Sequence, residues 1–498
     1  MKLEVEEVKT ESQKLIHKTT SVCPECLKVL NASIYEENGR VMISKTCPEH
    51  GDFTDVYWSD VDLYYKAKKY QRNEVKLETF NTKVDKGCPF DCGLCEAHKS
   101  HSGLANIVVT NKCDLSCWYC FFYAEKAGYV YEPTLEQVSK MLKNLRGERP
   151  VPCNALQITG GEPTMREDLA DIIRMAKKEG FEHVQLNTNG IKIGNDFDLF
   201  KKLSDAGVGV LYLSFDGVSK KTNPKNHGAI PKVLENSRKT KNMNIVLVPT
   251  VIGGVNDFEV GDILDFALQN NDVVKGINYQ PVSLVGRMPR KQREEMRVTI
   301  PDVIKRIEKH TNGEVGRGDF YPIPYTGVFS DFIESLTGKA QYDLSTHFAC
   351  GMGTYVFRDG ERLVPITRFV DVDGLSEFLK ENTEGVKNSN KVLFDIKLVF
   401  KLKGFIDNSK KPKWLDMYRL LFDTLVKHDY SSLGRLHSNS LFIGMMHFMD
   451  LYNYDIERVE KCVIHYATPD DKIVPFCAFN VLPELYRDKS QKMFSASP

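Results

Sequence analysis

Short apolar runs alternate with amphipathic stretches from about residue 105 to residue 283. The short runs are nearly continuous in Val, Ile and Leu, as in parallel strands buried on both faces. The longer stretches repeat apolar residues three and four positions apart, which is the period of a helix packed on a core. The pattern predicts strands at 105–110, 155–159, 183–188, 208–215, 244–252 and 276–283, and helices at 134–145, 169–180, 197–207, 230–239 and 260–269.

A repeated β/α unit predicts an α/β fold, a partial (β/α)6 barrel. Thr134 and Gln137 form a capping-box pattern at the start of the first helix. Gly180 and Gly207 stand where the second and third helices must end. By analogy with complete barrels, we expect the catalytic groups on loops at the carboxyl ends of the strands.

The N-terminal segment has the pattern of a small metal-binding module. Cys23 and Cys26 precede a hairpin-like stretch with an Asn38–Gly39 turn, and Cys47 follows it. Two cysteine knuckles joined by a hairpin are typical of a zinc ribbon or a rubredoxin-like site, with His50 or a distant cysteine as the fourth ligand. The spacing does not distinguish zinc from iron. A metal-stapled module without chemistry is the alternative interpretation.

The remaining pattern divides the chain into four regions. Residues 1–60 form the metal module, and 61–103 a linker that carries a cysteine triplet. Residues 104–299 form the barrel. Long amphipathic stretches in 300–498 predict a mostly helical C-terminal domain.

Charge and composition narrow the class of protein. The 67 Lys and Arg residues balance 67 Asp and Glu residues, so no overall field attracts nucleic acid. No apolar run approaches the roughly 18 residues needed to span a bilayer, and the N-terminus is polar where a signal peptide is apolar. We therefore expect a cytoplasmic protein. In that reducing compartment its 13 cysteines indicate metal ligation, not disulfides.

The cysteines fall into groups. Cys153 stands alone and is interpreted as a small core residue. Directly after the first predicted strand, Cys113, Cys117 and Cys120 form a C-x3-C-x2-C loop. Three thiolates at this spacing can hold three corners of a four-iron cluster and leave the fourth iron open for a substrate.

This triplet after the first strand of a partial barrel resembles the radical S-adenosylmethionine (SAM) superfamily. The resemblance implies that the open iron of a 4Fe-4S cluster chelates the methionine part of SAM. An electron then enters the sulfonium and a 5′-deoxyadenosyl radical departs. It also implies a low-potential donor such as ferredoxin or flavodoxin, and names Cys113, Cys117 and Cys120 as the catalytic cluster ligands.

Motifs at the ends of later strands match the same superfamily. A GGEP motif ends the second strand, NTNG the third and SFDG the fourth. Glycines let a backbone approach a ligand, and Glu162 can accept from its ammonium group. A lone GG or NG would indicate only a turn. The resemblance implies these cofactor-binding residues: Tyr119, Gly160, Gly161, Glu162, Asn189, Ser214 and Asp216.

Two further cysteine groups are interpreted as ligands of one or two auxiliary 4Fe-4S clusters. Cys88, Cys92 and Cys95 repeat the catalytic spacing, but no strand precedes them. Cys350 resembles the opening of an auxiliary-cluster extension, with Ile366 and Thr367 where a cysteine is usual. Cys462 and Cys477 would complete a second set, with Cys153, His465 or no residue as its fourth ligand. Isolated buried cysteines are the alternative.

The cysteine modules and the C-terminal segment 440–480 together resemble archaeal tetraether lipid synthases. That resemblance implies coupling of the terminal methyl carbons of phytanyl chains, on an archaeol-type phospholipid taken from the cytoplasmic membrane face. Met445 and Met449 would line a tunnel, or pack in the core. Arg287 and Arg290 would bind a lipid phosphate, or belong to a solvated face.

Two other functions fit the same motifs. The first is a radical SAM enzyme that modifies a peptide or a cofactor precursor, because auxiliary clusters also serve such enzymes. The second is a non-catalytic iron–sulfur electron carrier. An open iron beside ordered strand-end motifs argues against the carrier, which needs no open iron.

Overall fold

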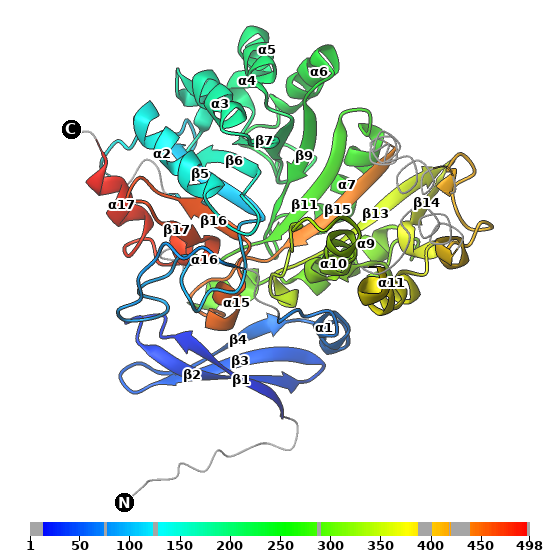
Figure 1. The fold of residues 1–498 in the computed structure, drawn as a ribbon, viewed down its shortest axis with the longest axis horizontal. Helices are drawn as coiled ribbons and strands as arrows, with labels where there is room; N and C mark the ends of the chain where they lie inside the picture. The colour runs from blue at the N-terminus through cyan, green and yellow to red at the C-terminus, as the bar shows by residue number, and fades with distance from the viewer. Residues whose placement is uncertain are drawn as a thin grey trace, which may run out of the picture.

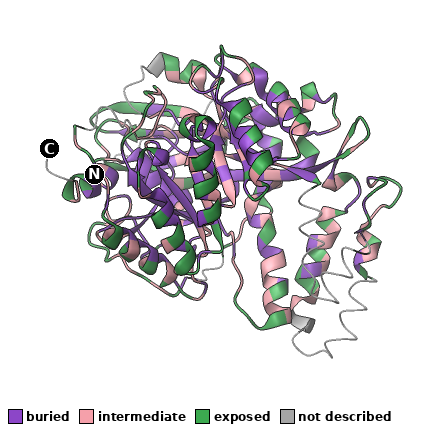
Figure 2. Ribbon diagram, turned by 90° about the horizontal axis from the view of Figure 1, so that it is seen from above, coloured by how far each residue is buried: buried purple, intermediate pink, exposed green. Residues whose placement is uncertain are grey.

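The computed structural model describes residues 13–73, 77–122, 128–285, 290–386, 401–417, 419 and 439–495. A small antiparallel sheet from the N-terminus lies beneath a large mixed sheet with helices on its outer face (Figure 1). The interior strands are buried, and the covering helices alternate buried and exposed residues (Figure 2). Among the described residues, no helix is both long enough and apolar enough to cross a membrane.

The N-terminal module is a four-stranded antiparallel sheet. Its strands are, in order, β1 (Lys14–Val22), β2 (Val29–Glu37), β3 (Arg40–Cys47) and β4 (Gly51–Trp58). Asn38 and Gly39 both have positive φ, the conformation of a two-residue turn between twisted strands. The predicted hairpin is confirmed. The helix α1 (Val61–Lys68) then leads away from the module.

The barrel prediction is confirmed strand by strand. Six parallel strands lie side by side in the order β11, β9, β8, β7, β6, β5. Their bounds are β5 (Leu104–Thr110), β6 (Ala155–Gly160), β7 (His183–Thr188), β8 (Val210–Ser214), β9 (Asn244–Val248) and β11 (Val274–Pro281), with a short β10 (Thr250–Val251). The intervening helices are α2 (Leu135–Arg146), α3 (Leu169–Lys178), α4 (Ile191–Asn195), α5 (Phe197–Ala206), α6 (Ile230–Thr240) and α7 (Val260–Gln269). The capping box of Thr134 and Gln137 is present.

Strands from the C-terminal region extend both edges of this sheet. β15 (Ser440–Met446) pairs parallel with β11, and β16 (Ile464–Ala467) pairs parallel with β5. β13 (Gly351–Asp359) and β17 (Ile473–Pro475) then add antiparallel strands outside them. Both edge strands of a partial barrel have unpaired backbone groups, and these additions satisfy them. Residues 441–446, which the pattern placed in an amphipathic helical stretch, are therefore strand.

The other C-terminal elements are mainly helices. They are α8 (Arg290–Met296), α9 (Ile300–His310), α10 (Gly327–Thr337), α11 (Val372–Val386), α15 (Ile456–Glu460), α16 (Phe476–Val481) and α17 (Arg487–Met493), with the short strands β12 (Tyr321–Pro322) and β14 (Arg362–Pro365). The amphipathic stretches predicted at 392–406 and 414–428 lie largely outside the described residues.

The N-terminal sheet is tied to the segment that precedes α15. The Asp455 carboxylate accepts hydrogen bonds from Thr19 Oγ1 at 2.7 Å and from Tyr57 at 2.8 Å. Lys45 Nζ donates to the Leu451 carbonyl at 2.7 Å. Because Lys45 is buried, this contact fixes the metal module against residues 451–455.

A buried acid joins the barrel to β16. Glu148 is 1% exposed and accepts from the Ser102 amide at 2.9 Å, while Ser102 Oγ contacts His465 Nδ1 at 2.9 Å. Burial raises the pKa of Glu148 to about 7, and the hydrogen bonds from Ser102 offset only part of this desolvation.

Glu148→Gln should change how stability depends on pH. A raised carboxyl pKa contributes stability that is fully present below the unfolded value of about 4.5 and is lost as pH rises through about 7. Glutamine does not titrate. Between about pH 5 and about pH 8, the free energy of unfolding of the variant should therefore fall by about 2 kcal/mol less than that of the wild type. Urea unfolding at both pH values measures it. Glu136→Gln, at an exposed position of α2, should leave the drop unchanged.

Candidate active site

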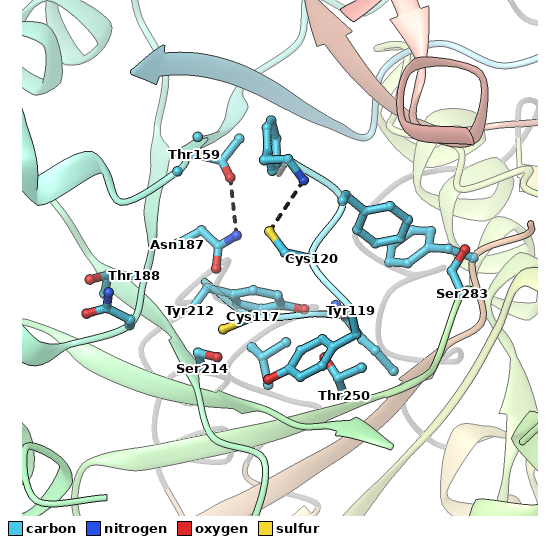
Figure 3. Close-up of a pocket in the computed structure, with 18 of the residues that line it drawn as sticks. Cys117, Tyr119, Cys120, Thr159, Asn187, Thr188, Tyr212, Ser214, Thr250 and Ser283 are labelled. Carbon is cyan, nitrogen blue, oxygen red and sulfur yellow. Dashed lines mark hydrogen bonds between the residues drawn. The ribbon is translucent and has the colours of Figure 1, made fainter. Parts of the chain in front are cut away.

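A cavity of about 430 Å³ opens at the carboxyl ends of the barrel strands. The cysteine loop after β5 forms one wall, and the ends of β6, β7 and β8 form another (Figure 3). Aromatic side chains from β16 and α16 close a third side. The cavity therefore lies where the strand pattern predicts the catalytic groups.

The three cysteines of the loop all line this cavity. Each of Cys113, Cys117 and Cys120 is partly exposed to it, and backbone amides donate to two of the sulfurs: Leu115 N to Cys113 at 3.4 Å and Phe122 N to Cys120 at 3.3 Å. Amide donors stabilise thiolate ligands. Burial raises the pKa of Cys113 to about 12, so a nearby metal charge is needed to keep it ionised. The loop thus fits an iron–sulfur cluster.

The glycines of the GGEP motif are required by packing. A Cβ on Gly160 would lie 2.1 Å from the Thr110 carbonyl oxygen, and one on Gly161 would lie 2.2 Å from that of Lys112. Close approach lets Gly161 N and Glu162 N donate to those two carbonyls, at 2.9 and 2.7 Å. The glycines thereby hold the base of the cysteine loop, a reason that the sequence pattern did not supply.

Glu162 links the ends of β6 and β7 through three hydrogen bonds. Its carboxylate accepts from Thr164 Oγ1 at 2.6 Å, Thr188 Oγ1 at 2.8 Å and the Asn189 amide at 2.7 Å. Burial raises its pKa, and these donors act against that shift. Glu162 lines the cavity, so it can meet a ligand while it also fixes the NTNG turn.

A second polar side chain fixes the other two motifs. Asn226 Nδ2 donates to the carbonyls of Asn189 at 2.6 Å and Ser214 at 2.7 Å. Asn189 Nδ2 in turn donates to Asp114 of the cysteine loop at 2.6 Å. Asn189 and Ser214 line the cavity, as predicted for cofactor-binding residues, although their role stays a prediction.

Asp216 lies behind Tyr119 and does not line the cavity. Its carboxylate accepts from the Tyr119 hydroxyl and pairs with Lys225 Nζ at 2.5 Å. Lys225 Nζ also donates to the Tyr119 hydroxyl at 2.9 Å, and it lies 5.3 Å from the centroid of the Tyr119 ring. The positive charge of Lys225 lowers the pKa of Cys117, against the larger effect of burial. Lys225 therefore fixes the aromatic ring beside the cluster loop.

Lys225→Met should weaken SAM binding roughly tenfold, or about 1.4 kcal/mol. Without the cation, Tyr119 loses one of its two hydroxyl partners and Asp216 is left buried without its counter-charge. Equilibrium dialysis with anaerobically reconstituted protein measures the affinity. The exposed Lys232, which bonds Asn195, gives the matched control Lys232→Met. Equal SAM affinity in the two variants would contradict a positioning role for Lys225.

The N-terminal ligands converge as a single-ion site. Cys26 and Cys47 sulfurs lie 3.9 Å apart, and His50 Nδ1 lies 3.5 Å from the Cys47 sulfur and 3.7 Å from that of Cys23. Ligands about 2.3 Å from a tetrahedral ion stand about 3.8 Å apart. His50 therefore fits the predicted role of fourth ligand by geometry, and among the described residues no distant cysteine joins the group.

The other cysteines form two neighbouring groups. Cys88 and Cys92 sulfurs are 4.0 Å apart, with Cys95 close enough to affect the pKa of Cys92. Burial raises the pKa of Cys462 to about 12 and the nearby Cys350 raises it further, while Cys462 and Cys350 both add to the effect of burial on the pKa of Cys477. Both groups fit the proposed auxiliary ligand sets.

The two residues considered as fourth ligands are engaged elsewhere. Cys153 donates to the Ala155 carbonyl at 3.4 Å, and its electrostatic neighbours include Glu148 and Arg146. His465 uses one ring nitrogen toward Ser102 and the other toward His98, 3.0 Å away. This favours the alternative in which the second auxiliary set has no protein fourth ligand.

The proposed lipid contacts do not gather at the cavity. Met445 and Met449 are buried in the core, where the sulfur of Met449 accepts from the Asp455 amide at 3.2 Å. Core packing, the other interpretation of this stripe, accounts for both. Arg287 lies outside the described residues, and only the backbone of Arg290 at the start of α8 is described.

Polar side chains on the barrel strands line the cavity floor and were missed in the sequence. Gln157 accepts from Gln185 at 2.6 Å, and Asn187 donates to Thr159 at 3.2 Å (Figure 3). Tyr212 accepts from Asn278 on β11. A sequence signal for these residues was present, because single amides stand inside strongly apolar strands. A polar group buried at such a position needs a hydrogen-bond partner or a ligand.

Comparison with known proteins agrees with this geometry. Residues 107–267 match the Radical SAM superfamily, and residues 15–59 match the HMPTM N-terminal zinc ribbon domain. The GTP 3′,8-cyclase of Clostridium acetobutylicum is 28% identical over 52% of this chain and 77% of its own. The crystal structure of HydG, a maturase of the [FeFe]-hydrogenase, aligns with a TM-score of 0.34 and 14% identity, over 42% of this chain and 50% of its own.

A full-length relative corrects the lipid prediction. The 7,8-dihydro-6-hydroxymethylpterin dimethyltransferase of Methanocaldococcus jannaschii is 49% identical over 96% of this chain and 95% of its own. This finding overturns the predicted coupling of phytanyl chains and the archaeol-type lipid partner. The cavity lining agrees with this correction, because polar side chains such as Gln157 and Asn187 reach it, unlike a wholly apolar tunnel for alkyl chains. This chain, with its metal-binding ribbon and its SAM and 4Fe-4S site, belongs to the radical SAM superfamily and, within it, to the family of that dimethyltransferase.

Proposed function

We propose that this protein methylates 7,8-dihydro-6-hydroxymethylpterin or a closely related dihydropterin. The observation that carries the proposal is the 49% identity to the pterin dimethyltransferase along 96% of the chain. This identity supports a role in modifying a cofactor precursor, the first of the two other functions that fit the sequence motifs.

The cavity lining suits a flat heterocycle with polar edges. Phe448 and Phe476 stack on each other with centroids 3.9 Å apart, and both line the cavity beside Tyr466. Aromatic faces bind planar rings by offset stacking. Asn187 and Gln157 on the opposite side offer both donors and acceptors, the groups that read the edge of a nucleobase-like ring.

The protein's own residues supply placement. When bound, the cluster and SAM supply reductive cleavage of the sulfonium. Cys113, Cys117 and Cys120 would hold the cluster, and Tyr119, fixed by Lys225, would flank the nucleoside. Burial of the cavity walls would exclude water from a reactive species.

The test uses the full chain, reconstituted with iron and sulfide without oxygen. Dihydro-6-hydroxymethylpterin, SAM and a low-potential reductant are added, in one arm alone and in another with the small-molecule fraction of a cell extract as a further one-carbon source. We expect pterin-dependent 5′-deoxyadenosine and pterin products heavier by one and two methyl groups, measured by mass spectrometry. SAM cleavage that ignores the pterin in both arms, with no methylated product, would refute the proposal.

Two auxiliary iron–sulfur clusters are part of this proposal. The support is the convergence of Cys88, Cys92 and Cys95, and of the set made by Cys350, Cys462 and Cys477. Burial raises the pKa of Tyr454, and thiols of both sets, Cys92 and Cys477, raise it further, so both sets lie near this side chain. A ferredoxin or flavodoxin remains the expected class of electron donor.

A further inference from the structure

Arg458 on α15 is a buried cation that has no carboxylate partner among the residues that the structure describes. Its side chain is 1% exposed, its Nε donates to the Cys350 sulfur at 3.4 Å, and its Nη2 donates to the His447 carbonyl at 2.7 Å. The guanidinium carbon lies 5.4 Å from the Tyr57 ring centroid. Within the described part of the chain, Nη1 has no hydrogen-bond acceptor.

A second buried arginine shows how carboxylates can pair fully with a buried guanidinium. Arg297 is equally enclosed, and its guanidinium bonds two carboxylates, Asp55 at 2.5 Å and Asp450 at 2.6 Å. Asp455, three residues before Arg458, has its oxygens taken by Thr19, Tyr57 and the Glu457 amide. The two acids of α15 itself, Glu457 and Glu460, pair with Lys461 and Lys99. A buried guanidinium without an anion carries a large desolvation cost.

The groups that can supply negative charge to Arg458 are thiols. Cys350 is its direct partner, and Cys477 also acts on it electrostatically. All three cysteines of this set become anionic when they bind metal, and bound sulfides add further acceptors for Nη1.

We infer that Arg458 is the counter-charge of the auxiliary site formed by Cys350, Cys462 and Cys477, and donates hydrogen bonds to the sulfurs of an anionic iron–sulfur cluster there. A fixed cation stabilises the more negative, reduced state of the cluster. Arg458 thus makes the cluster easier to reduce and helps the chain retain it. The inference does not depend on the pterin substrate.

The test measures iron and reduction potential in the reconstituted full chain. Cys350→Ser defines the iron held by this set, since it removes one ligand. Methionine is close to arginine in size and is neutral. The Arg458→Met variant should either contain as little iron as Cys350→Ser, or keep its iron in a cluster with a lower reduction potential. In the second case the ratio of reduced to oxidised cluster at fixed potential should drop at least tenfold, or 59 mV for one electron. Electron paramagnetic resonance during a redox titration measures the fraction of reduced cluster and its reduction potential.

Matched variants separate this role from a structural one. Arg297→Met should lower the unfolding temperature and leave the potential unchanged, while Arg458→Lys should keep the iron of the wild type. The inference fails if Arg458→Met folds with wild-type iron content and potential, or if Cys350→Ser loses no iron. It fails also if Arg458→Met does not fold while Arg458→Lys does, which would indicate a structural arginine. No pterin is added, so failure here is distinct from failure of the methylation assay.

Discussion

Replacing Cys47 with Ser is expected to release the metal of the N-terminal module and to lower the unfolding temperature of the chain substantially. The four ligand atoms already stand at the separations of a tetrahedral site. Structural zinc contributes about 10–16 kcal/mol of binding free energy in small modules, and that energy is folding energy. The core beside the metal is small, chiefly Leu30 and Phe53, so little else would hold the knuckles together.

The effect should spread beyond the module. Thr19, Lys45 and Tyr57 anchor residues 451–455, which lead into the helix of Arg458. We expect Cys47→Ser to lose its zinc by elemental analysis and to melt earlier by differential scanning calorimetry. Cys153→Ser, at a buried thiol outside every cluster, controls for loss of a sulfur. Metal content and melting like those of Cys153→Ser would count against a structural site.

The barrel was predictable because its strands and helices are local patterns. Each of the six strands begins and ends within four residues of its predicted range, and the helix at residues 260–269 matches throughout. The edge strands were not predictable in this way. Residues 440–446 are almost continuously apolar, a pattern that fits a buried helix or a buried strand. Pairing with β11 decides between them, and that partner lies about 160 residues away along the chain.

The candidate site likewise has residues that the sequence pattern predicts and residues that it does not. Cysteine spacing is written in the sequence, so the triplet of Cys113, Cys117 and Cys120 could be located before the fold was known. Lys225 and Arg458 carry no motif, and their contacts with Tyr119 and Cys350 exist only once distant segments meet. Substrate class was the weakest inference. It depends on scattered amides such as Asn187, which a motif shared across a superfamily does not encode.

Cys120→Ser is expected to reduce SAM cleavage to the limit of detection while the chain stays folded. A serine hydroxyl is a poor ligand for iron, so one corner of the cluster is lost. The Phe122 amide would keep its loop position through backbone contacts such as Cys120 N to the Cys117 carbonyl at 3.1 Å. The assay counts 5′-deoxyadenosine per chain by liquid chromatography after anaerobic reconstitution with SAM and dithionite.

The same assay has a matched control within the chain. Cys153→Ser removes a thiol that bonds the Ala155 carbonyl and does not line the cavity, so its cleavage activity should equal that of the wild type. Iron analysis should show a loss in Cys120→Ser alone, and circular dichroism should show both chains folded. Wild-type 5′-deoxyadenosine yields from Cys120→Ser would mean that the C-x3-C-x2-C loop does not hold the reactive cluster, since no other described cysteines line the cavity.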